Sequence, residues 1–286
     1  MRRTIGETNL QVFPIGLGAM PLGIRGSLQL EQAVDVIHAA IDAGMNFIDT
    51  ANVYCTDNQD IGLNERTIAS ALESIDDSDI VVATKGGLIR PQGRWERRGS
   101  PQDLRSACEN SLTDLKVESI ALYQLHAPDA LVPFADSVGE LARLKSEGKI
   151  QNIGLSNVDR NQIDEATSIA TISSVQNRCN VFHQRDLNNG LIDYLRQQSI
   201  TYIAYSPMGG GTNHVNLRDE SVLSQLAEQY EVTVYQIVLA WLLAKSDNIL
   251  PIPGASRISS AVSSANAVNV QLSAQEVAQI DRIGSD

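Results

Sequence analysis

Four side chains that can hold or exchange protons stand at, or just beyond, the ends of short apolar segments. Asp49 lies in NFIDT, residues 46–50, and Tyr54 stands five residues after it. Lys85 directly follows IVVAT, and His126 directly follows ALYQL. An ammonium near a phenol lowers the phenol's pKa, and a carboxylate can keep that ammonium charged. Together the four could polarise a carbonyl and protonate its oxygen while a hydride, such as that of a nicotinamide, attacks the carbon.

Each of these residues also has an ordinary structural interpretation. A lone aspartate at a strand end is often a turn former or a helix cap, and a lone tyrosine in a loop is often a half-buried surface residue. Lys85 could be a solvated charge, and His126 could simply cap a strand before Ala127 and Pro128. Because four such residues follow apolar segments and their chemistry interlocks, a shared site is favoured over four separate structural roles.

A short apolar run followed by an amphipathic stretch recurs along the chain. The runs are too short and too uniformly apolar for exposed antiparallel strands, and are typical of strands covered on both faces. Eight alternations predict a parallel sheet closed into a (β/α)8 TIM barrel, with an N-terminal β-hairpin that turns near residues 6–9. Catalytic residues of such barrels lie at the carboxyl ends of the strands, so the four side chains would meet at one rim. The eight runs are 13–18, 46–50, 79–85, 119–126, 150–156, 173–177, 200–206 and 248–254.

Capping signals locate some of the intervening helices. Ser100 is a plausible N-cap with Pro101 at the first helical position, and Gly44 and Gly148 are plausible helix stops. The segment 232–245 is apolar nearly all round, which predicts a buried helix.

A doubly wound sheet with a dinucleotide fingerprint is the competing architecture. Its glycine pattern is incomplete, because GLGAMP has Gly16 and Gly18 but Pro21 where the third glycine belongs. There is no Walker A motif either.

Composition and charge restrict the class of protein. The 286 residues are 43% hydrophobic and 20% charged, which predicts a soluble globular protein, interpreted as one barrel domain over residues 1–286. A formal charge of -12 argues against nucleic acid as a partner, and no apolar run approaches the roughly 20 residues that span a membrane. Three distant cysteines give no metal spacing. The cysteine spacing and the lack of an apolar segment after the basic start both predict a cytoplasmic location.

Several motifs resemble those of the aldo-keto reductases. DTANVY, TKGG and LYQLHAPD occur in the family's order, and GKIQNIGLSN, SVQNRCN, AYSPM and IPGAS extend the similarity over nearly the whole chain. The resemblance implies a (β/α)8 barrel that uses NADPH to reduce aldehydes or ketones, with Asp49, Tyr54, Lys85 and His126 as its catalytic tetrad. One departure is Cys55, which stands where the family usually has glycine.

The resemblance and the residue types together predict where the cofactor lies. Neutral side chains ending the fifth and sixth strands suit a carboxamide, and the tyrosine ending the seventh could stack on the nicotinamide. The loop 206–219 carries three successive glycines and is interpreted as folding over the pyrophosphate. A helix beginning near Ile258 would present its N-terminus to phosphate, with Arg257 on the 2′-phosphate of NADPH. The predicted contacts are Ser156, Asn157, Gln176, Tyr205, Ser206, Pro207, Met208, Gly210, Ser256, Arg257 and Ser264.

These cofactor residues also have structural alternatives. Asn157 could cap the following helix, Tyr205 could fill the barrel mouth, and the glycine loop could be an ordinary connection. Ser263 and Ser264 stand where many family members have Glu and Asn, which predicts weaker adenine contacts.

Three functions follow, in order of preference. The first is an NADPH-dependent reductase of small carbonyl compounds. The second is a cofactor-binding partner protein of the potassium-channel β-subunit type, with little turnover. The third is a barrel lyase or isomerase that uses Lys85 as a Schiff base, against which the IPGASR segment argues.

Loops after the strands would set the substrate. The loop after Lys85 is long and could attract an anion, although a solvated loop explains its charge equally well. KGGLIRP and LYQLHAPD most resemble the branch that includes pyridoxal reductases, whose substrate is an aromatic aldehyde. The short C-terminal end after the last helix favours an open site and broad aldehyde tolerance. The loop's charged and aromatic residues are Arg90, Arg94, Trp95, Arg97 and Arg98.

Overall fold

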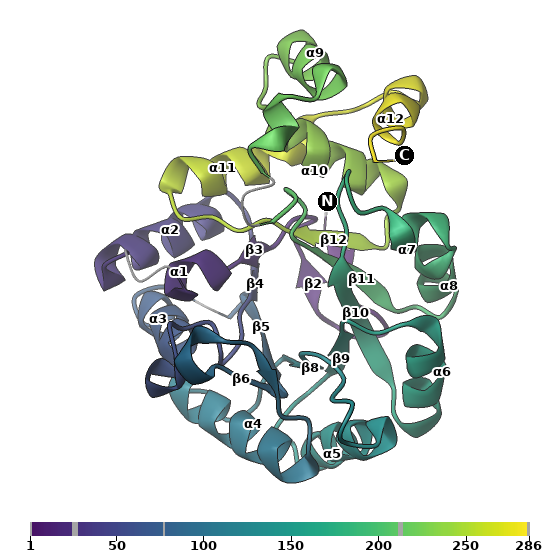
Figure 1. Ribbon diagram of the computed structural model, residues 1–286. Helices are drawn as coiled ribbons and strands as arrows, with labels where there is room; N and C mark the ends of the chain where they lie inside the picture. The colour runs from purple at the N-terminus through teal and green to yellow at the C-terminus, as the bar shows by residue number, and fades with distance from the viewer. Residues whose placement is uncertain (1, 25–27, 77, 211–213, 285–286) are drawn as a thin grey trace.

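A parallel sheet of eight strands forms the centre of the described chain and curls into a barrel (Figure 1). The computed structural model describes residues 2–24, 28–76, 78–210 and 214–284. Each strand lies on one of the eight predicted runs, and the order around the sheet is β12-β11-β10-β9-β8-β5-β4-β3. The strands are β3 (Leu17–Gly18), β4 (Phe47–Asp49), β5 (Val81–Gly86), β8 (Leu122–Leu125), β9 (Ile153–Ser156), β10 (Ile172–Arg178), β11 (Thr201–Tyr205) and β12 (Ile249–Ile252). The predicted TIM-barrel fold is confirmed.

Backbone hydrogen bonds between the first and last strands close the barrel. The amide of Gly16 donates to Pro251 O at 3.0 Å, and that of Gly18 donates to Pro253 O at 2.9 Å. A Cβ on Gly18 would lie 2.8 Å from the carbonyl oxygen of Ile252. The glycines of GLG, which do not form a dinucleotide fingerprint, therefore allow the two edge strands to approach each other.

Helices surround the strands, and most of them connect one parallel strand to the next (Figure 1). The connecting helices are α2 (Leu30–Asp42), α3 (Leu63–Leu72), α4 (Pro101–Leu115), α5 (Phe134–Ser146), α6 (Arg160–Ile169), α8 (Leu191–Gln197) and α10 (Val234–Lys245). Helix α11 (Ile258–Asn266) follows β12 and packs against α2 and α10. The others are α1 (Met20–Ile24), α7 (Arg185–Asn188), α9 (Ser221–Gln229) and α12 (Ala274–Ile280), with 3-10 turns η1 (Asn58–Asp60), η2 (Pro91–Gly93), η3 (Asn216–Arg218) and η4 (Ala267–Asn269).

The predicted helix signals act as expected. The Ser100 hydroxyl accepts from the amide of Asp103 at the start of α4. Gly44 and Gly148 follow the ends of α2 and α5 with φ of 101° and 76°, a region that glycine enters without steric cost. The middle of helix α10, residues 237–242, is buried, in agreement with its apolar sequence.

Alternation along the strands separates two cores. Residues one position apart point to opposite faces, so one set lines the barrel interior and the other packs against the helices. The interior cluster includes Phe47, Val81, Ala83 and Leu122, while their neighbour Ile48 belongs to the layer beneath the helices. Toward the carboxyl ends of the strands, the inward-facing positions become polar. The candidate site therefore lies at that end of the barrel.

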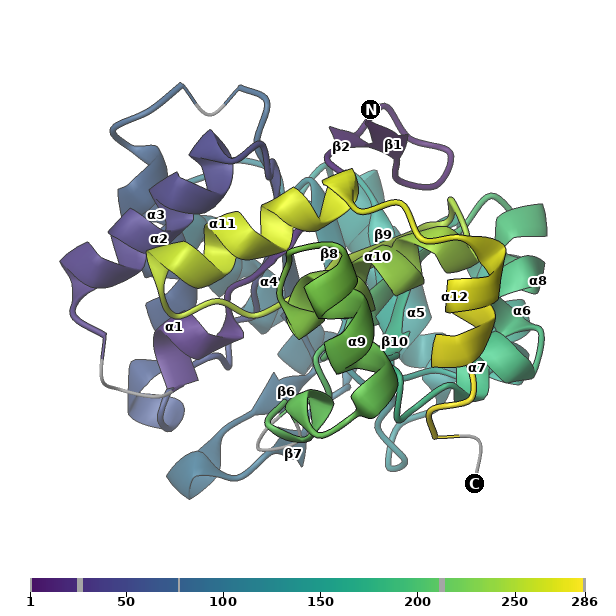
Figure 2. The same cartoon turned by 90° about the horizontal axis from the view of Figure 1, so that it is seen from above.

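Two hairpins lie at opposite ends of the barrel (Figure 2). The predicted N-terminal hairpin, β1 (Arg3–Thr4) with β2 (Gln11–Val12), covers the amino ends of the strands. Its Ile5 and Val12 are fully buried in the interior cluster, so this end is plugged. The second hairpin, β6 (Leu88–Ile89) with β7 (Glu96–Arg97), rises from the loop after β5.

A buried acid outside the barrel interior makes stability depend on pH. Glu65 of α3 is fully buried, and its Oε1 accepts from the Thr84 hydroxyl at 2.5 Å. Burial raises the pKa of Glu65 to about 7, against the opposing effect of that hydrogen bond. Between about pH 4.5 and 7 the folded state therefore binds more protons than the unfolded state, so this group's contribution to stability falls as pH rises through that window.

Replacing Glu65 with Gln should remove this pH dependence. Relative to the parent protein, Glu65→Gln should gain about 3 kcal/mol of unfolding free energy between pH 4.5 and pH 8, because the parent alone must ionise the buried carboxyl. Urea unfolding at several pH values measures the difference. The exposed Glu165 provides the control, since Glu165→Gln should give a difference that does not vary with pH. A constant offset for Glu65→Gln would contradict the prediction.

No helix within the described residues has the length and apolar character needed to cross a membrane.

Candidate active site

The four predicted catalytic residues come together at the carboxyl rim of the barrel. Asp49 ends β4, Lys85 lies near the end of β5, and His126 directly follows β8. Tyr54 stands in the loop after β4. Each is at most 9% exposed, so the cluster is almost closed to solvent.

Lys85 is the centre of the cluster. Its Nζ donates to Asp49 Oδ1 at 2.6 Å, to the carbonyl oxygen of Thr50 at 2.7 Å and to the Tyr54 hydroxyl at 3.1 Å. An ammonium has three N–H donors, and these three acceptors use all of them. Burial lowers the pKa of Lys85, and the Asp49 carboxylate opposes that shift.

Two buried glutamines hold the second oxygen of Asp49. Gln176 Nε2 donates to Asp49 Oδ2 at 2.7 Å, and Gln124 Nε2 donates to the same atom at 3.2 Å. Gln176 was predicted to contact the cofactor, whereas Gln124 was not among the predicted site residues. A signal for Gln124 existed, because it is a polar residue inside ALYQL, two positions before His126 and therefore on the same strand face.

The phenol of Tyr54 keeps its proton more strongly than the sequence analysis predicted. Burial, followed by the charge of Asp49, raises the pKa of Tyr54 well above its ordinary value of about 10. The predicted lowering by Lys85 is therefore wrong for the protein alone, because a fully buried phenolate loses its hydration and faces a carboxylate as well as the ammonium.

His126 is neutral in this setting. Burial, followed by the charge of Lys85, holds the pKa of its imidazole well below the ordinary value of about 6.5. Its Nδ1 is buried and has no hydrogen-bond partner among the described residues. The ring packs edge-to-face against Tyr54, with centroids 5.7 Å apart.

The loop that carries Tyr54 is held in place by hydrogen bonds and by close packing of helix α1. The Thr50 hydroxyl donates to Asn64 Oδ1 at 2.6 Å, and Asn64 Nδ2 donates to the carbonyl oxygen of Ala19 at 3.0 Å. A Cβ on Gly23 of α1 would lie 2.0 Å from the carbonyl oxygen of Tyr54, so only glycine allows that helix to pack there. These contacts hold the phenol in place before any ligand binds.

The hairpin after Lys85 delivers an aromatic ring to the cluster. The Trp95 ring centroid lies 6.4 Å from that of Tyr54 and 6.2 Å from that of His126, and the indole is 47% exposed. The guanidinium carbon of Arg90 lies 4.0 Å from the Trp95 centroid. Both residues belong to the charged loop noted in the sequence, but their position beside the tetrad was not predicted.

The predicted nicotinamide contacts gather at the same rim. Asn157 Nδ2 donates to the carbonyl oxygen of His126 at 2.9 Å and to Ser156 Oγ at 3.1 Å. The Tyr205 hydroxyl donates to Asn157 Oδ1 at 2.8 Å. Asn157 is not the helix cap considered as its alternative, because Asp159 caps α6. Its amide instead links the ends of three strands.

The loop after β11 contains most of the predicted pyrophosphate contacts. Ser206 adopts a φ of 50°, and Gly209 and Gly210 also have positive φ. The amide of Gly209 donates to the Ser206 carbonyl oxygen at 3.0 Å, which makes a tight turn that includes Pro207 and Met208. The third predicted glycine, Gly211, lies outside the described residues.

The predicted phosphate-binding helix exists as α11. It begins at Ile258, as predicted, and its N-cap residue Arg257 makes no side-chain capping bond. Ser256 and Arg257 are exposed just before the helix, whereas Ser264 is buried, being only 7% exposed. Ser256 and Arg257 are therefore more accessible to a ligand than Ser264.

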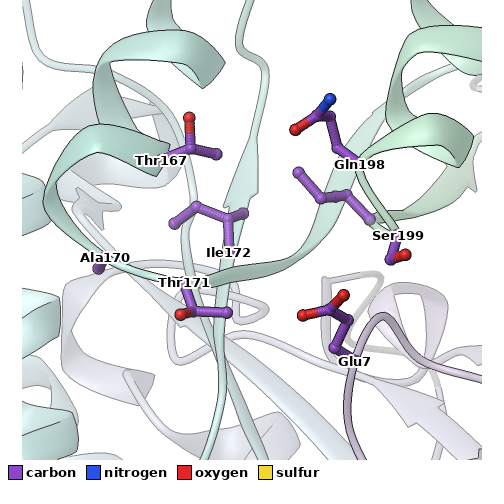
Figure 3. A pocket seen from close by; sticks show the side chains of 8 residues that line it. Glu7, Thr167, Ala170, Thr171, Ile172, Gln198 and Ser199 are labelled. Atoms are coloured by element: carbon purple, nitrogen blue, oxygen red, sulfur yellow. The ribbon is translucent and has the colours of Figure 1, made fainter.

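A cavity far from this rim has no part in the site (Figure 3). Several of its lining residues precede β10 and β11, so it opens at the amino ends of the strands, whereas barrel active sites lie at the carboxyl ends. The lining residues are Glu7, Thr167, Ala170, Thr171, Ile172, Gln198, Ser199 and Ile200. In the described part of the chain, no group of three His, Cys, Asp or Glu side chains could hold a metal ion.

A closed parallel barrel with a phenol, an amine, a carboxylate and an imidazole gathered at its carboxyl rim is an arrangement typical of barrel enzymes, and these groups are able to transfer protons. The particular family follows from comparison. The model of the aldo/keto reductase family matches residues 14–285, and the chain therefore belongs to that family.

Relatives of known name agree with this assignment. A probable aldo-keto reductase of Glycine max is 31% identical over 96% of this chain and 86% of its own length. An aldo-keto reductase of Klebsiella pneumoniae, solved with NADPH, superimposes with a TM-score of 0.85 at 27% identity, over 100% of this chain and 96% of that one. A structure from the same organism with NADP and acetate also reaches 0.85, at 28% identity and the same coverage.

Proposed function

We propose that this protein reduces aldehydes or ketones to alcohols with NADPH as the hydride donor. The observation that carries the proposal is the pair of contacts at Lys85, whose ammonium donates to Asp49 and to the Tyr54 oxygen. Because Lys85 is the donor in the second contact, the phenol's own proton stays available for a substrate. Family membership and the NADPH and NADP complexes of the Klebsiella relatives support the same function.

The residues at the rim fit a nicotinamide dinucleotide phosphate. Ser156 and the Oε1 atom of Gln176 would hold the carboxamide, and the half-buried ring of Tyr205 would lie against the nicotinamide. The uncapped start of α11, with Ser256 and Arg257, would hold the adenosine 2′-phosphate. When bound, the cofactor would supply a hydride to the carbonyl carbon.

The chain's own residues would handle the substrate oxygen. His126, kept neutral by burial, would donate a hydrogen bond to that oxygen and fix its direction. Tyr54 would give its proton to the oxygen as negative charge develops there, which yields the alcohol. Lys85, oriented by Asp49, would stabilise the phenolate that remains until water returns the proton.

This arrangement does not favour a Schiff base on Lys85. A nucleophilic amine must be unprotonated, but all three donor positions of Lys85 Nζ meet acceptors, one of them a carboxylate at 2.6 Å. Borohydride treatment in the presence of an aldehyde should therefore leave Lys85 unmodified.

NADPH oxidation against a panel of carbonyl compounds tests the proposed function. Pyridoxal, nitrobenzaldehydes, methylglyoxal and short ketones sample the aromatic and aliphatic classes. We expect continuous turnover with at least one aldehyde and an aromatic preference if the pyridoxal reductase resemblance extends to the substrate. Oxidation that stops after one bound equivalent of NADPH would overturn the proposal and support the cofactor-binding alternative.

The low pKa of His126 predicts an unusual pH profile. A histidine titrating near pH 6.5 would change kcat/KM around that value, but burial keeps His126 neutral through that range. We expect kcat/KM for aldehyde reduction to show no inflection between pH 8 and pH 6. Steady-state rates at constant ionic strength provide the measurement. An inflection near 6.5 that disappears in His126→Gln would contradict the assignment.

A further inference from the structure

Arg90 is a buried cation for which the described part of the chain provides no counter-ion. The residue is only 8% exposed, although arginine is rarely buried unless it is paired. Its Nη1 atom has no hydrogen-bond partner among the described residues, and within them no carboxylate lies within ion-pair distance of it. An unpaired buried charge is costly, so a group that approaches from outside and pairs with it would bind favourably.

The guanidinium is held in a fixed place. The backbone amide of Arg90 donates to Asn58 Oδ1 at 2.6 Å, and its side-chain Nε donates to the Gly93 carbonyl oxygen at 3.2 Å. Its planar group lies 4.0 Å from the centre of the Trp95 ring. These contacts use Nε and one face and leave the Nη1 donors unused, so the fork that recognises carboxylates or phosphates is pre-organised.

Arg90 lies close to the predicted proton donor. Its guanidinium carbon is 4.0 Å from the Trp95 centroid, which is 6.4 Å from the Tyr54 centroid, so the two groups are no more than about 10 Å apart. Burial raises the pKa of Cys55 to about 11, and the charge of Arg90 is the largest opposing influence. The 2.6 Å hydrogen bond from the Arg90 amide to Asn58 Oδ1 places the residue beside the loop that carries Tyr54.

The surrounding hairpin is positive on an acidic protein. Residues 88–98 carry four arginines and one glutamate, whereas the whole chain has a formal charge of -12. Asp57 and Asp60, on the neighbouring loop, also act on Cys55, but neither forms an ion pair with Arg90. A local positive region beside a site attracts anions even when the net charge is negative.

We infer that Arg90 is a specificity-determining residue that binds an anionic group of the substrate. The inference rests on the proposed reductase function and narrows its substrate class to aldehydes bearing a carboxylate or a phosphate a short chain away from the carbonyl. The carbonyl would lie at Tyr54 and His126, the body of the substrate would pack on Trp95, and its anionic end would pair with Arg90.

A matched pair of substrates tests the carboxylate. 4-Carboxybenzaldehyde and its methyl ester, methyl 4-formylbenzoate, have the same ring and aldehyde but differ in charge. We expect kcat/KM for the acid to exceed that for the ester at least tenfold, mainly through KM. In Arg90→Met the ratio should fall to about one, and Arg90→Lys should retain part of it.

Arg94 provides the matched control variant. It lies on the same hairpin but is exposed and pairs with Glu96 at 3.4 Å. Arg94→Met should leave the acid-to-ester ratio within twofold of the parent protein. The comparison of ratios also corrects for any movement of Trp95 in Arg90→Met, because such movement would affect acid and ester alike.

Glyceraldehyde 3-phosphate and glyceraldehyde form the phosphate arm of the test. A preference for the phosphorylated aldehyde with none for 4-carboxybenzaldehyde would identify phosphate as the natural anion, and the reverse would identify carboxylate. A ratio near one in both arms, with the uncharged aldehydes still reduced, would overturn the inference and leave the proposed function intact.

Binding of the product alcohol gives a readout that does not need turnover. Calorimetric titration of the NADP-loaded protein with 4-(hydroxymethyl)benzoate should show at least tenfold weaker binding in Arg90→Met, while the methyl ester should bind both proteins equally. If no aldehyde of either kind were reduced, the proposed function would fail, and this titration would still decide whether Arg90 binds an anion.

Discussion

Replacing Tyr54 with phenylalanine should lower kcat for aldehyde reduction by about 100-fold to 10,000-fold, the usual contribution of a general acid. The phenol is the only proton donor that the described tetrad offers at neutral pH, since Lys85 is committed to three acceptors and His126 is neutral. NADPH affinity, measured by quenching of protein fluorescence, should stay within about twofold, because the phenol ring and its surroundings are unchanged.

A distant tyrosine provides the control for this variant. The Tyr194 hydroxyl donates to Asp164 on the outer helices, and Tyr194→Phe also removes a hydroxyl but should leave kcat unchanged. Near-normal turnover in Tyr54→Phe would remove the phenol from the mechanism, and a parallel loss of NADPH binding would indicate a structural role instead.

Replacing Lys85 with methionine should abolish turnover and also destabilise the fold. The variant leaves the carboxylate of Asp49 buried without its ammonium partner, and breaking a buried ion pair in this way costs about 3–5 kcal/mol. Gln124 and Gln176 still donate to Asp49, so we expect a folded protein with a lower urea midpoint. Far-UV circular dichroism during urea unfolding measures the change.

A double variant separates stability from chemistry. Adding Asp49→Asn to Lys85→Met removes the buried charge, so at least half of the lost unfolding free energy should return. Turnover should remain absent, because no ammonium then stabilises the Tyr54 phenolate. Recovery of both properties together would mean that Lys85 acts only through folding, and recovery of neither would mean that the ion pair is not the source of the instability.

The barrel and its tetrad could be predicted because both depend on local patterns. An apolar run that ends in a polar residue marks a buried strand and its exposed end, and eight such runs fix the order of the sheet. Asp49 ends its strand, Lys85 lies one residue before the end of its strand, and His126 directly follows its strand, so the closure of the barrel alone brings them to one rim. No knowledge of loop conformation was needed for these three.

Features that depend on burial or on loop paths could not be predicted. The rise in the pKa of Tyr54 depends on how completely the phenol is desolvated, which no motif states. Gln176 was predicted to face the cofactor only, but its nitrogen binds Asp49, because both lie on the inner face of the barrel. Trp95 reaches the tetrad, with Arg90 packed on its ring, because the hairpin folds back, a path that the sequence of the loop does not reveal.

Among the described residues, β6 and β7 form a separate two-stranded sheet and add no strand to the barrel sheet. Their residues can therefore change during evolution without disturbing the register of the eight-stranded sheet or the network at Lys85. Transplanting residues 88–98 into a related barrel should therefore transfer the preference for anionic aldehydes. One exchangeable segment would then determine substrate choice, while the barrel and its tetrad would retain the reaction.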